Sequence, residues 1–311
     1  MSGMKVGFIG LGTMGAPIAL NAIKGGHELV VHDIRREAGE PHLKEGAKWA
    51  SSPREVAAGC DVIFTSLPGP KEVEAVALAE DGLISALEPG KAYFDLTTNS
   101  PTLIRKIHGI FLKHGVQVLD APVSGGPEGA RTGRMAIWVG GDEATFERHL
   151  PILDAMGDKP TYVGPIGSGA IAKLVHNCSG YILQTALAET FSMGVKAGLD
   201  PEALWRAVRQ GAQGRRRTFD SLSLQFLPGR FDPPDFALAL AHKDVGLAVE
   251  LGRELDVPMR LANMTLEELA TAIERGWGGR DSRSAMLLQM ERAGVEIKVP
   301  AENIDKILKE D

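Results

Sequence analysis

Short runs of apolar residues alternate with helical patterns through the first half of the chain. The runs have the length of buried strands, and several of the segments between them carry apolar residues at helical spacing. The pattern predicts strands at 4–9, 28–32, 61–66, 91–95, 116–119, 135–139 and 160–163, and helices at 14–25, 70–79, 100–113 and 143–156. This alternation is typical of an α/β protein with a parallel, doubly wound sheet.

The pattern changes near residue 165, where the strand signals end. Residues 169–197 predict one long helix, and further helices are expected at about 201–210, 236–254, 259–275, 281–292 and 301–309. A helix of about 29 residues spans roughly 43 Å, so we expect it to pack against both the first domain and a second subunit. The sequence therefore predicts a sheet domain over 1–165 and an all-helical domain over 166–311.

The first predicted strand runs directly into a glycine turn, and the chain from Met4 reads MKVGFIGLGTMG. Gly10 permits the tight turn, Gly12 lets the backbone approach a pyrophosphate, and Gly15 lets helix and strand pack closely. The N–H groups and dipole of the next helix would face the phosphates. The candidates for binding a dinucleotide are therefore Gly10, Leu11, Gly12, Thr13, Met14 and Gly15.

An acidic residue ends the second predicted strand. Asp33 lies 18 residues beyond Gly15, where a carboxylate accepts hydrogen bonds from the adenosine ribose and repels a 2′-phosphate. This favours NAD over NADP. Arg35 and Arg36 could turn toward a phosphate, but we interpret them as a solvated loop. A second glycine pattern, GSGAIA from Gly167, opens a helix with no strand behind it, so we do not expect it to bind a dinucleotide.

Composition excludes several classes of protein. Apolar residues make up 44% of the chain and charged residues 24%, and the net charge of −6 gives no basic surface for nucleic acid. No apolar run approaches the roughly 18 residues of a membrane span, and the N-terminus has no signal pattern. The two cysteines, Cys60 and Cys178, indicate a reducing compartment without disulfides. We expect a cytoplasmic protein without a metal site.

A polar stripe follows one face of the predicted long helix. Its members recur at offsets 0, 3, 4, 7, 8 and 11 and are Lys173, His176, Asn177, Gly180, Tyr181 and Gln184. A buried stripe should be apolar, so this one is a candidate site that opens toward a cofactor cleft. A solvated face or a seam of interhelical hydrogen bonds would give the same periodicity, which leaves both interpretations open.

A second segment favours the site. The sequence DAPVSGGPEGA, from Asp120, follows the strand that ends at Leu119, where a substrate would meet the nicotinamide in a doubly wound sheet. Ser124 offers a hydroxyl, and Gly125 and Gly126 offer unobstructed N–H groups. Together these groups can hold a carboxylate.

Four motifs then occur in order along the chain: the glycine turn with Met14, DAPVSGGPEGARTG, GSGAIAKLVHN, and HKDVGLA from His242. With them the chain resembles the β-hydroxyacid dehydrogenase family, which includes 3-hydroxyisobutyrate dehydrogenase, over essentially its whole length. The resemblance implies a Rossmann-type domain followed by an all-α domain, a homodimer or homotetramer, and NAD(P)-dependent oxidation of a small 3-hydroxy acid or the reverse reduction.

The resemblance also implies roles for single residues. Lys173 matches the catalytic lysine and Asn177 the asparagine that orients the substrate. The remaining matches are Ser124, Gly125 and Gly126 for the substrate carboxylate, Leu67, Pro68 and Thr98 for the cofactor, and Lys243 for both nicotinamide and substrate.

The chemistry of alcohol oxidation agrees with a lysine at this position. The reaction sends a hydride to nicotinamide and a proton to a base. A free lysine, with a pKa of about 10.4, is a poor base near neutrality. Burial beside the positive charge of the nicotinamide would lower the pKa toward about 7–8. We therefore expect Lys173 to be the general acid/base, with Asn177 one turn further along to hold substrate or lysine.

Two departures from the family pattern keep alternatives open. His176-Asn177 stands where 3-hydroxyisobutyrate dehydrogenases usually have Asn-Asn, and this pair followed by Tyr181 resembles 6-phosphogluconate dehydrogenase. That enzyme has a glutamate just before the tyrosine, where this chain has Gly180, so decarboxylation lacks its expected proton donor. A 6-phosphogluconate-like sugar-acid dehydrogenase stays the alternative. Lys173 argues against an imine reductase and against a non-catalytic dinucleotide-binding protein.

The substrate, the direction of the reaction and the role of His176 are not readable from the sequence. Arg215, Arg216 and Arg217 follow GAQG in a turn that the resemblance places near the cleft. One of them is a candidate to bind a second anionic group, although a solvated basic loop is the simpler interpretation. Arg134 raises the same question.

Overall fold

The computed structural model describes residues 4–196, 198–211, 214, 219–254, 256 and 258–309. The chain separates into two compact units, Met1–His176 and Asn177–Asp311, called unit 1 and unit 2 below. The division falls inside one long helix. The last strand ends at Gly164, and each later element in the described residues is a helix. The expected domain boundary at 165 stays a prediction.

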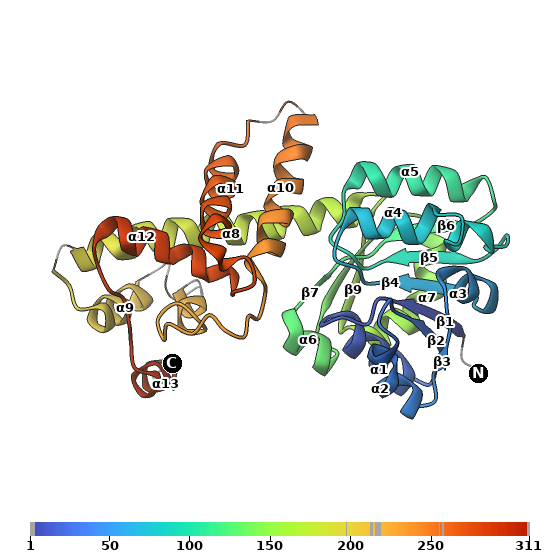
Figure 1. Cartoon of the computed structure of the whole chain (residues 1–311), viewed down its shortest axis with the longest axis horizontal. Coiled ribbons are helices and arrows are strands. Elements are labelled where there is room, and N and C mark those ends of the chain that lie inside the picture. Colours follow the sequence, from blue (N-terminus) through green and yellow to red (C-terminus); the bar gives the residue numbers. More distant parts are fainter. Residues whose placement is uncertain are drawn as a thin grey trace. The chain divides into compact units, whose positions relative to one another are not determined.

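Unit 1 is built on a nine-stranded sheet in the order β3-β2-β1-β4-β5-β6-β8-β7, with β9 paired to β8 (Figure 1). The seven predicted strands are all present, each within one residue of its expected ends, and two strands of two residues join them. The strands are β1 (Lys5–Ile9), β2 (Glu28–His32), β3 (Lys48–Trp49), β4 (Val62–Thr65), β5 (Ala92–Asp95), β6 (Gln117–Asp120), β7 (Val123–Ser124), β8 (Ala136–Gly140) and β9 (Lys159–Gly164).

The sheet is parallel from β3 to β6 and mixed beyond β6. Both β6 and β7 pair antiparallel with β8, while β8 and β9 are parallel. The predicted doubly wound sheet is therefore mostly parallel, with an antiparallel region at one edge. The chain between Ser124 and Ala136 turns back beside β7 through a helix of seven residues, a connection that suits an antiparallel pair.

Helices cover both faces of this sheet, and each face has its own core. Phe8, Phe64 and Phe94 stack across the central strands on one face, under α1, α6 and α7. Tyr93 and Phe111 belong to the core of the other face, under α3, α4 and α5. The helices of unit 1 are α1 (Gly15–Lys24), η1 (Arg36–Gly39), α2 (Glu40–Lys44), α3 (Pro53–Gly59), α4 (Pro70–Leu78), η2 (Leu83–Ser85), α5 (Pro101–Leu112), α6 (Gly126–Thr132) and α7 (Glu143–Met156).

Unit 2 is helical and is entered by α8, which begins in unit 1 (Figure 1). Its core gathers Phe191 of α8, Trp205 of α9 and Ile307 of α13 around the segment with Phe226 and Leu227. The helices are α8 (Ser168–Lys196), α9 (Pro201–Gln210), η4 (Phe219–Ser223), α10 (Leu238–Glu254), α11 (Arg260–Ala272), η5 (Ile273–Trp277), η6 (Ser282–Ala285), α12 (Met286–Ala293) and α13 (Ala301–Lys309).

Three general features limit the chemistry of the described residues. Among them, none of the helices joins the length and the apolar character that a membrane crossing requires. The same residues contain no group of three histidine, cysteine or acidic side chains arranged to bind a metal ion. Cys60 and Cys178 are both buried free thiols, and burial raises the pKa of each.

Candidate active site

The glycine turn after β1 combines two crowded positions with one open position. A Cβ on Gly10 would lie 2.2 Å from the Ser66 carbonyl oxygen, and one on Gly15 would lie 1.9 Å from the Gly10 oxygen. A Cβ on Gly12 would meet no heavy atom of the described residues within 4 Å. Gly10 and Gly15 therefore allow the turn to pack against β4, while Gly12 leaves backbone open to a ligand.

The two glycine patterns of the chain differ at the start of the helix that follows. Within the described residues, no side chain caps the N-terminus of α1. The Ala16 N–H donates to the Gly12 carbonyl at 3.0 Å and Pro17 has no N–H, so the helix start offers an anion chiefly its positive dipole end. At α8, the carboxylate of Asp120 accepts hydrogen bonds from the N–H groups of Gly167 (2.7 Å) and Ala170 (2.6 Å). The expectation that no strand precedes Gly167 is wrong, because β9 ends at Gly164. The Asp120 carboxylate therefore occupies the position at the start of α8 where a phosphate would otherwise bind.

Asp33 is tied to the glycine turn. Its Oδ2 accepts a hydrogen bond from the Leu11 N–H at 2.7 Å, and its Oδ1 accepts one from the Arg35 N–H at 2.9 Å. The Arg35 Nε lies 3.6 Å from the same Oδ1, and the Arg36 guanidinium lies 4.5 Å from the centre of the Trp49 ring. Both arginines therefore contact protein groups, and each oxygen of Asp33 keeps a lone pair for a ligand.

A buried network fixes the ends of β4 and β5, next to the residues expected to contact the cofactor. The Leu67 N–H donates to the Thr97 hydroxyl at 3.0 Å. Asp95 is fully buried and accepts hydrogen bonds from the Thr97 N–H (3.1 Å) and the Asn99 amide (2.7 Å). Burial raises the pKa of Asp95. The network holds the two loops that carry Leu67, Pro68 and Thr98.

Ser124 and His176 meet in unit 1. A hydrogen bond of 3.1 Å joins the Ser124 hydroxyl on β7 to His176 Nε2 on α8, and the Trp138 ring of β8 lies 5.2 Å from the imidazole. Burial, together with the positive charge of Lys173, lowers the pKa of His176. The imidazole is therefore neutral near pH 7. The structure thus brings Ser124, His176 and Lys173 together.

The two glycines after Ser124 have backbone conformations that suit glycine. Gly125 has φ 153° and Gly126 has φ 63°, and a Cβ on Gly125 would lie 2.9 Å from the Arg134 carbonyl oxygen. Both glycines are exposed, so their backbone is accessible to a ligand. The Arg134 side chain is also exposed, in the turn before β8.

Asn177 and Lys243 come together in unit 2 through a residue that the sequence analysis did not single out. Asp244 is buried, its carboxylate accepts a hydrogen bond from the Asn177 amide at 2.5 Å, and Lys243 Nζ lies 2.8 Å from its other oxygen. Asp244 therefore fixes the two residues expected to contact substrate. Its position directly after Lys243 in the HKDVGLA motif was the available signal.

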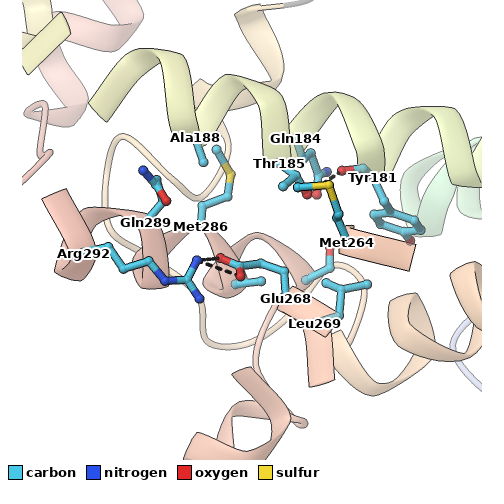
Figure 2. A pocket seen from close by; sticks show the side chains of 12 residues that line it. Tyr181, Gln184, Thr185, Ala188, Met264, Glu268, Leu269, Met286, Gln289 and Arg292 are labelled. Atoms are coloured by element: carbon cyan, nitrogen blue, oxygen red, sulfur yellow. Dashed lines mark hydrogen bonds and ion pairs between the residues drawn. The ribbon is translucent and has the colours of Figure 1, made fainter. Parts of the chain in front are cut away.

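The far end of the polar stripe lines a cavity inside unit 2. Tyr181 and Gln184 of α8 line a cavity of about 110 Å³ between α8, α11 and α12 (Figure 2). The ion pair between Glu268 of α11 and Arg292 of α12 lines the same cavity. Burial, with the nearby charge of Asp244, raises the pKa of Tyr181 well above its usual value, so the phenol stays protonated. The residues of the polar stripe therefore lie in different surroundings along α8, and only some of them belong to the candidate site.

Gly180 and the three arginines after Gly214 concern the choice of substrate. A Cβ on Gly180 would meet no heavy atom of the described residues within 4 Å, so this position has room for a larger side chain and simply lacks the glutamate. Arg215, Arg216 and Arg217 lie outside the described residues.

An open glycine turn after β1 and an acid after β2 that is tethered to this turn are typical of a dinucleotide-binding domain. Residues 5–164 match the family model described as the NAD binding domain of 6-phosphogluconate dehydrogenase. Residues 167–299 match the NAD-binding domain of NADP-dependent 3-hydroxyisobutyrate dehydrogenase. The chain belongs to the β-hydroxyacid dehydrogenase family and carries NAD(P)-binding domains.

Relatives of this family match most of the length of the chain. It is 34% identical to 2-(hydroxymethyl)glutarate dehydrogenase of Eubacterium barkeri, over 94% of this chain and 97% of the relative. It is 35% identical to 2-hydroxy-3-oxopropionate reductase of Escherichia coli, over 93% and 97%. The structure of Mycobacterium tuberculosis 3-hydroxyisobutyrate dehydrogenase with L-serine superposes with a TM-score of 0.82 at 30% identity, over 92% and 99%. The chain is accordingly an enzyme of the hydroxyacid dehydrogenase class.

Proposed function

We propose that the chain is an NAD-dependent dehydrogenase that interconverts a small 3-hydroxy acid and its semialdehyde or oxo acid, with Lys173 as the general acid/base. One observation carries the proposal. Lys173 acts electrostatically on His176, and His176 is hydrogen-bonded to Ser124 of the exposed glycine loop. An ammonium group and a candidate carboxylate-binding loop therefore belong to one site.

The chemistry requires two transfers from the substrate. NAD, when bound at the glycine turn, would supply the acceptor for the hydride that leaves the carbon carrying the hydroxyl. Lys173 Nζ takes the hydroxyl proton as the C=O bond forms, and it returns that proton in the reduction. The positive charge of the nicotinamide and burial in the loaded site would lower the pKa of Lys173, which favours its action as a base.

The proposed roles toward the substrate fall on the loop of unit 1 and on two polar side chains of unit 2. Ser124, with the backbone of Gly125 and Gly126, would bind the substrate carboxylate. Asn177 and Lys243 would orient the substrate, since Asp244 fixes both of them. The open turn at Gly12 and the uncapped start of α1 fit the pyrophosphate of the cofactor.

The cofactor preference follows from the surroundings of Asp33. A carboxylate at this position hydrogen-bonds the ribose hydroxyls and repels a 2′-phosphate. Arg35 and Arg36, the side chains that would bind such a phosphate, contact Asp33 and Trp49 instead. These contacts support NAD as the preferred cofactor.

The names of the relatives indicate a substrate class. 2-(Hydroxymethyl)glutarate, 2-hydroxy-3-oxopropionate and the L-serine of the Mycobacterium tuberculosis structure each carry a –CH2OH or –CHO group on the carbon next to the carboxylate. We infer the same arrangement for this substrate. The sugar-acid alternative is weaker because Gly180 supplies no carboxyl group.

The expected assembly is a homodimer or homotetramer. Val175 and Leu183 are exposed on α8, and Leu261 and Met264 are exposed on α11. Apolar side chains of this kind favour cover by a second subunit. A cytoplasmic location stays a prediction and rests on the two unpaired cysteines.

A substrate panel tests the proposal. The purified enzyme is assayed at 340 nm with NAD or NADP and with 3-hydroxyisobutyrate, L-serine, glycerate, threonate, 3-hydroxypropionate and 6-phosphogluconate. We expect the highest kcat/KM with NAD and an acid that carries a hydroxymethyl group beside its carboxylate. Activity confined to 6-phosphogluconate with release of CO2 would support the alternative, and failure of every 3-hydroxy acid would refute the proposal.

A further inference from the structure

We propose that Asp120 is the positioning residue of Lys173: it fixes the first turn of α8 to the end of β6 and thereby sets where the lysine amine lies. The inference rests on the proposed role of Lys173. It concerns a residue that would touch neither substrate nor cofactor and would act through the helix.

The Asp120 carboxylate contacts the start of α8 through two hydrogen bonds. Oδ1 accepts the Gly167 N–H at 2.7 Å and Oδ2 accepts the Ala170 N–H at 2.6 Å, so each carboxylate oxygen binds a different residue of the helix start. Two bonds from one planar group limit both sliding and rotation of that turn. Lys173 follows Ala170 by three residues and lies on the same side of the helix.

Close backbone packing surrounds this contact. A Cβ on Gly140 would lie 2.7 Å from Asp120 Oδ1 and 2.9 Å from the Gly169 nitrogen. A Cβ on Gly169 would lie 2.3 Å from the Trp138 carbonyl oxygen. The start of α8 is therefore pressed against β8 on both sides of the carboxylate. Since Asp120 is 1% exposed, water has little access to replace its hydrogen bonds.

The charged groups around Asp120 come from three elements. Asp95 lies opposite it in the register of β5 and β6, and the Arg105 side chain of α5 donates to the Ile166 carbonyl at 3.2 Å, just before α8. Lys173 and His176 lie on α8 itself. Burial raises the pKa of Asp120 to about 6, so near pH 7 the carboxylate is ionised and favours the positive end of the α8 dipole.

Asp142 provides a matched control within unit 1. It also places a carboxylate at the start of a helix, where its Oδ1 accepts the Thr145 N–H of α7 at 2.8 Å. None of the candidate site residues lies on α7. Asp142→Asn therefore makes the same chemical change at a helix start away from the candidate site.

A double-mutant cycle tests the inference. Asp120→Asn keeps the size of the side chain but turns an NH2 group toward one of the two helix N–H groups, which shifts the first turn. We expect kcat to fall about tenfold or more, because small misplacements of a catalytic group are costly. The dissociation constant of NAD, measured by fluorescence titration, should stay within about twofold of wild type. In the Lys173→Ala background the same change should lower kcat no further.

The remaining outcomes separate the two proposals. An equal loss from Asp120→Asn in both backgrounds, or no loss in either, overturns the positioning role. Full activity of Lys173→Ala overturns the proposed function itself, whatever Asp120→Asn does. Asp142→Asn should keep kcat in both backgrounds. If Asp120→Asn melts below the assay temperature, Asp120→Ser, whose hydroxyl still accepts one helix N–H, takes its place in the cycle with the same expected pattern.

Discussion

At the scale of single residues, the most informative side chain is a carboxylate with several partners. Asp33 accepts hydrogen bonds from the Leu11 and Arg35 N–H groups, and we propose that its negative charge discriminates between the two cofactors. Its type and position could be predicted from the sequence, because an acid at the end of the second strand is part of the dinucleotide pattern. Its bond to the glycine turn could not, because no periodicity reports a contact across 22 residues.

Replacing Asp33 tests the cofactor preference. Asp33→Asn keeps an oxygen for the Leu11 N–H but removes the charge, so the repulsion of a 2′-phosphate disappears. We expect the ratio of kcat/KM for NADP to that for NAD to rise at least about tenfold. The measurement is initial rates at 340 nm with both cofactors. Glu28→Gln removes a charge at the exposed start of the same strand and should leave the ratio unchanged, and an unchanged ratio in Asp33→Asn would contradict the assignment.

At the scale of elements, the sequence predicted what is periodic and missed what is short or buried. The seven longer strands and the long helix followed from apolar spacing, whereas β3 and β7, with two residues each, are too short to give a period. Lys173 and Asn177 were predicted as site residues from the polar stripe of the helix and from their motif. The sequence did not predict that Asp120 binds the start of α8 or that Asp244 binds Asn177. A buried acid cannot be told from a surface acid in the sequence until its hydrogen bonds are known.

The anchoring of α8 to β6 has a consequence for stability. Burial raises the pKa of Asp120 from 3.8 to about 6, so the folded protein holds a proton that the unfolded chain has released. Protonated Asp120 therefore adds to the free energy of unfolding. This contribution is complete below about pH 4 and is lost as pH rises through about 6, and it amounts to about 3 kcal/mol at most.

Asp120→Asn removes this titration. Between about pH 4.5 and about pH 7, the Tm of wild type relative to that of the variant should fall as pH rises. Differential scanning calorimetry measures both slopes. Asp142→Asn provides the comparison, since the hydrogen bonds from Thr145 lower the pKa of Asp142, which therefore titrates below this range. Parallel curves for wild type and Asp120→Asn would show that Asp120 does not titrate as the structure implies.

At the scale of the whole molecule, the residues proposed to act on cofactor and substrate are divided between the two compact units. Unit 1 carries the glycine turn, Asp33, the Ser124 loop and Lys173, while unit 2 carries Asn177, Lys243 and Asp244. The sequence predicted two domains from the point where the strand signals end, and it predicted the family from motifs in chain order. It could not predict that the division of the chain falls within α8, between Lys173 and Asn177, since one uninterrupted helix carries both residues.

The most direct test of the account is the rate of NADH formation in a single turnover by Lys173→Ala, followed at 340 nm in a stopped-flow instrument with the best substrate of the panel. We expect the rate to fall roughly 10²–10⁴-fold while the affinity for NAD is nearly unchanged. Lys196→Ala, at the far end of the same helix, should react like wild type. A rate for Lys173→Ala within about threefold of wild type would contradict the proposed role of this lysine.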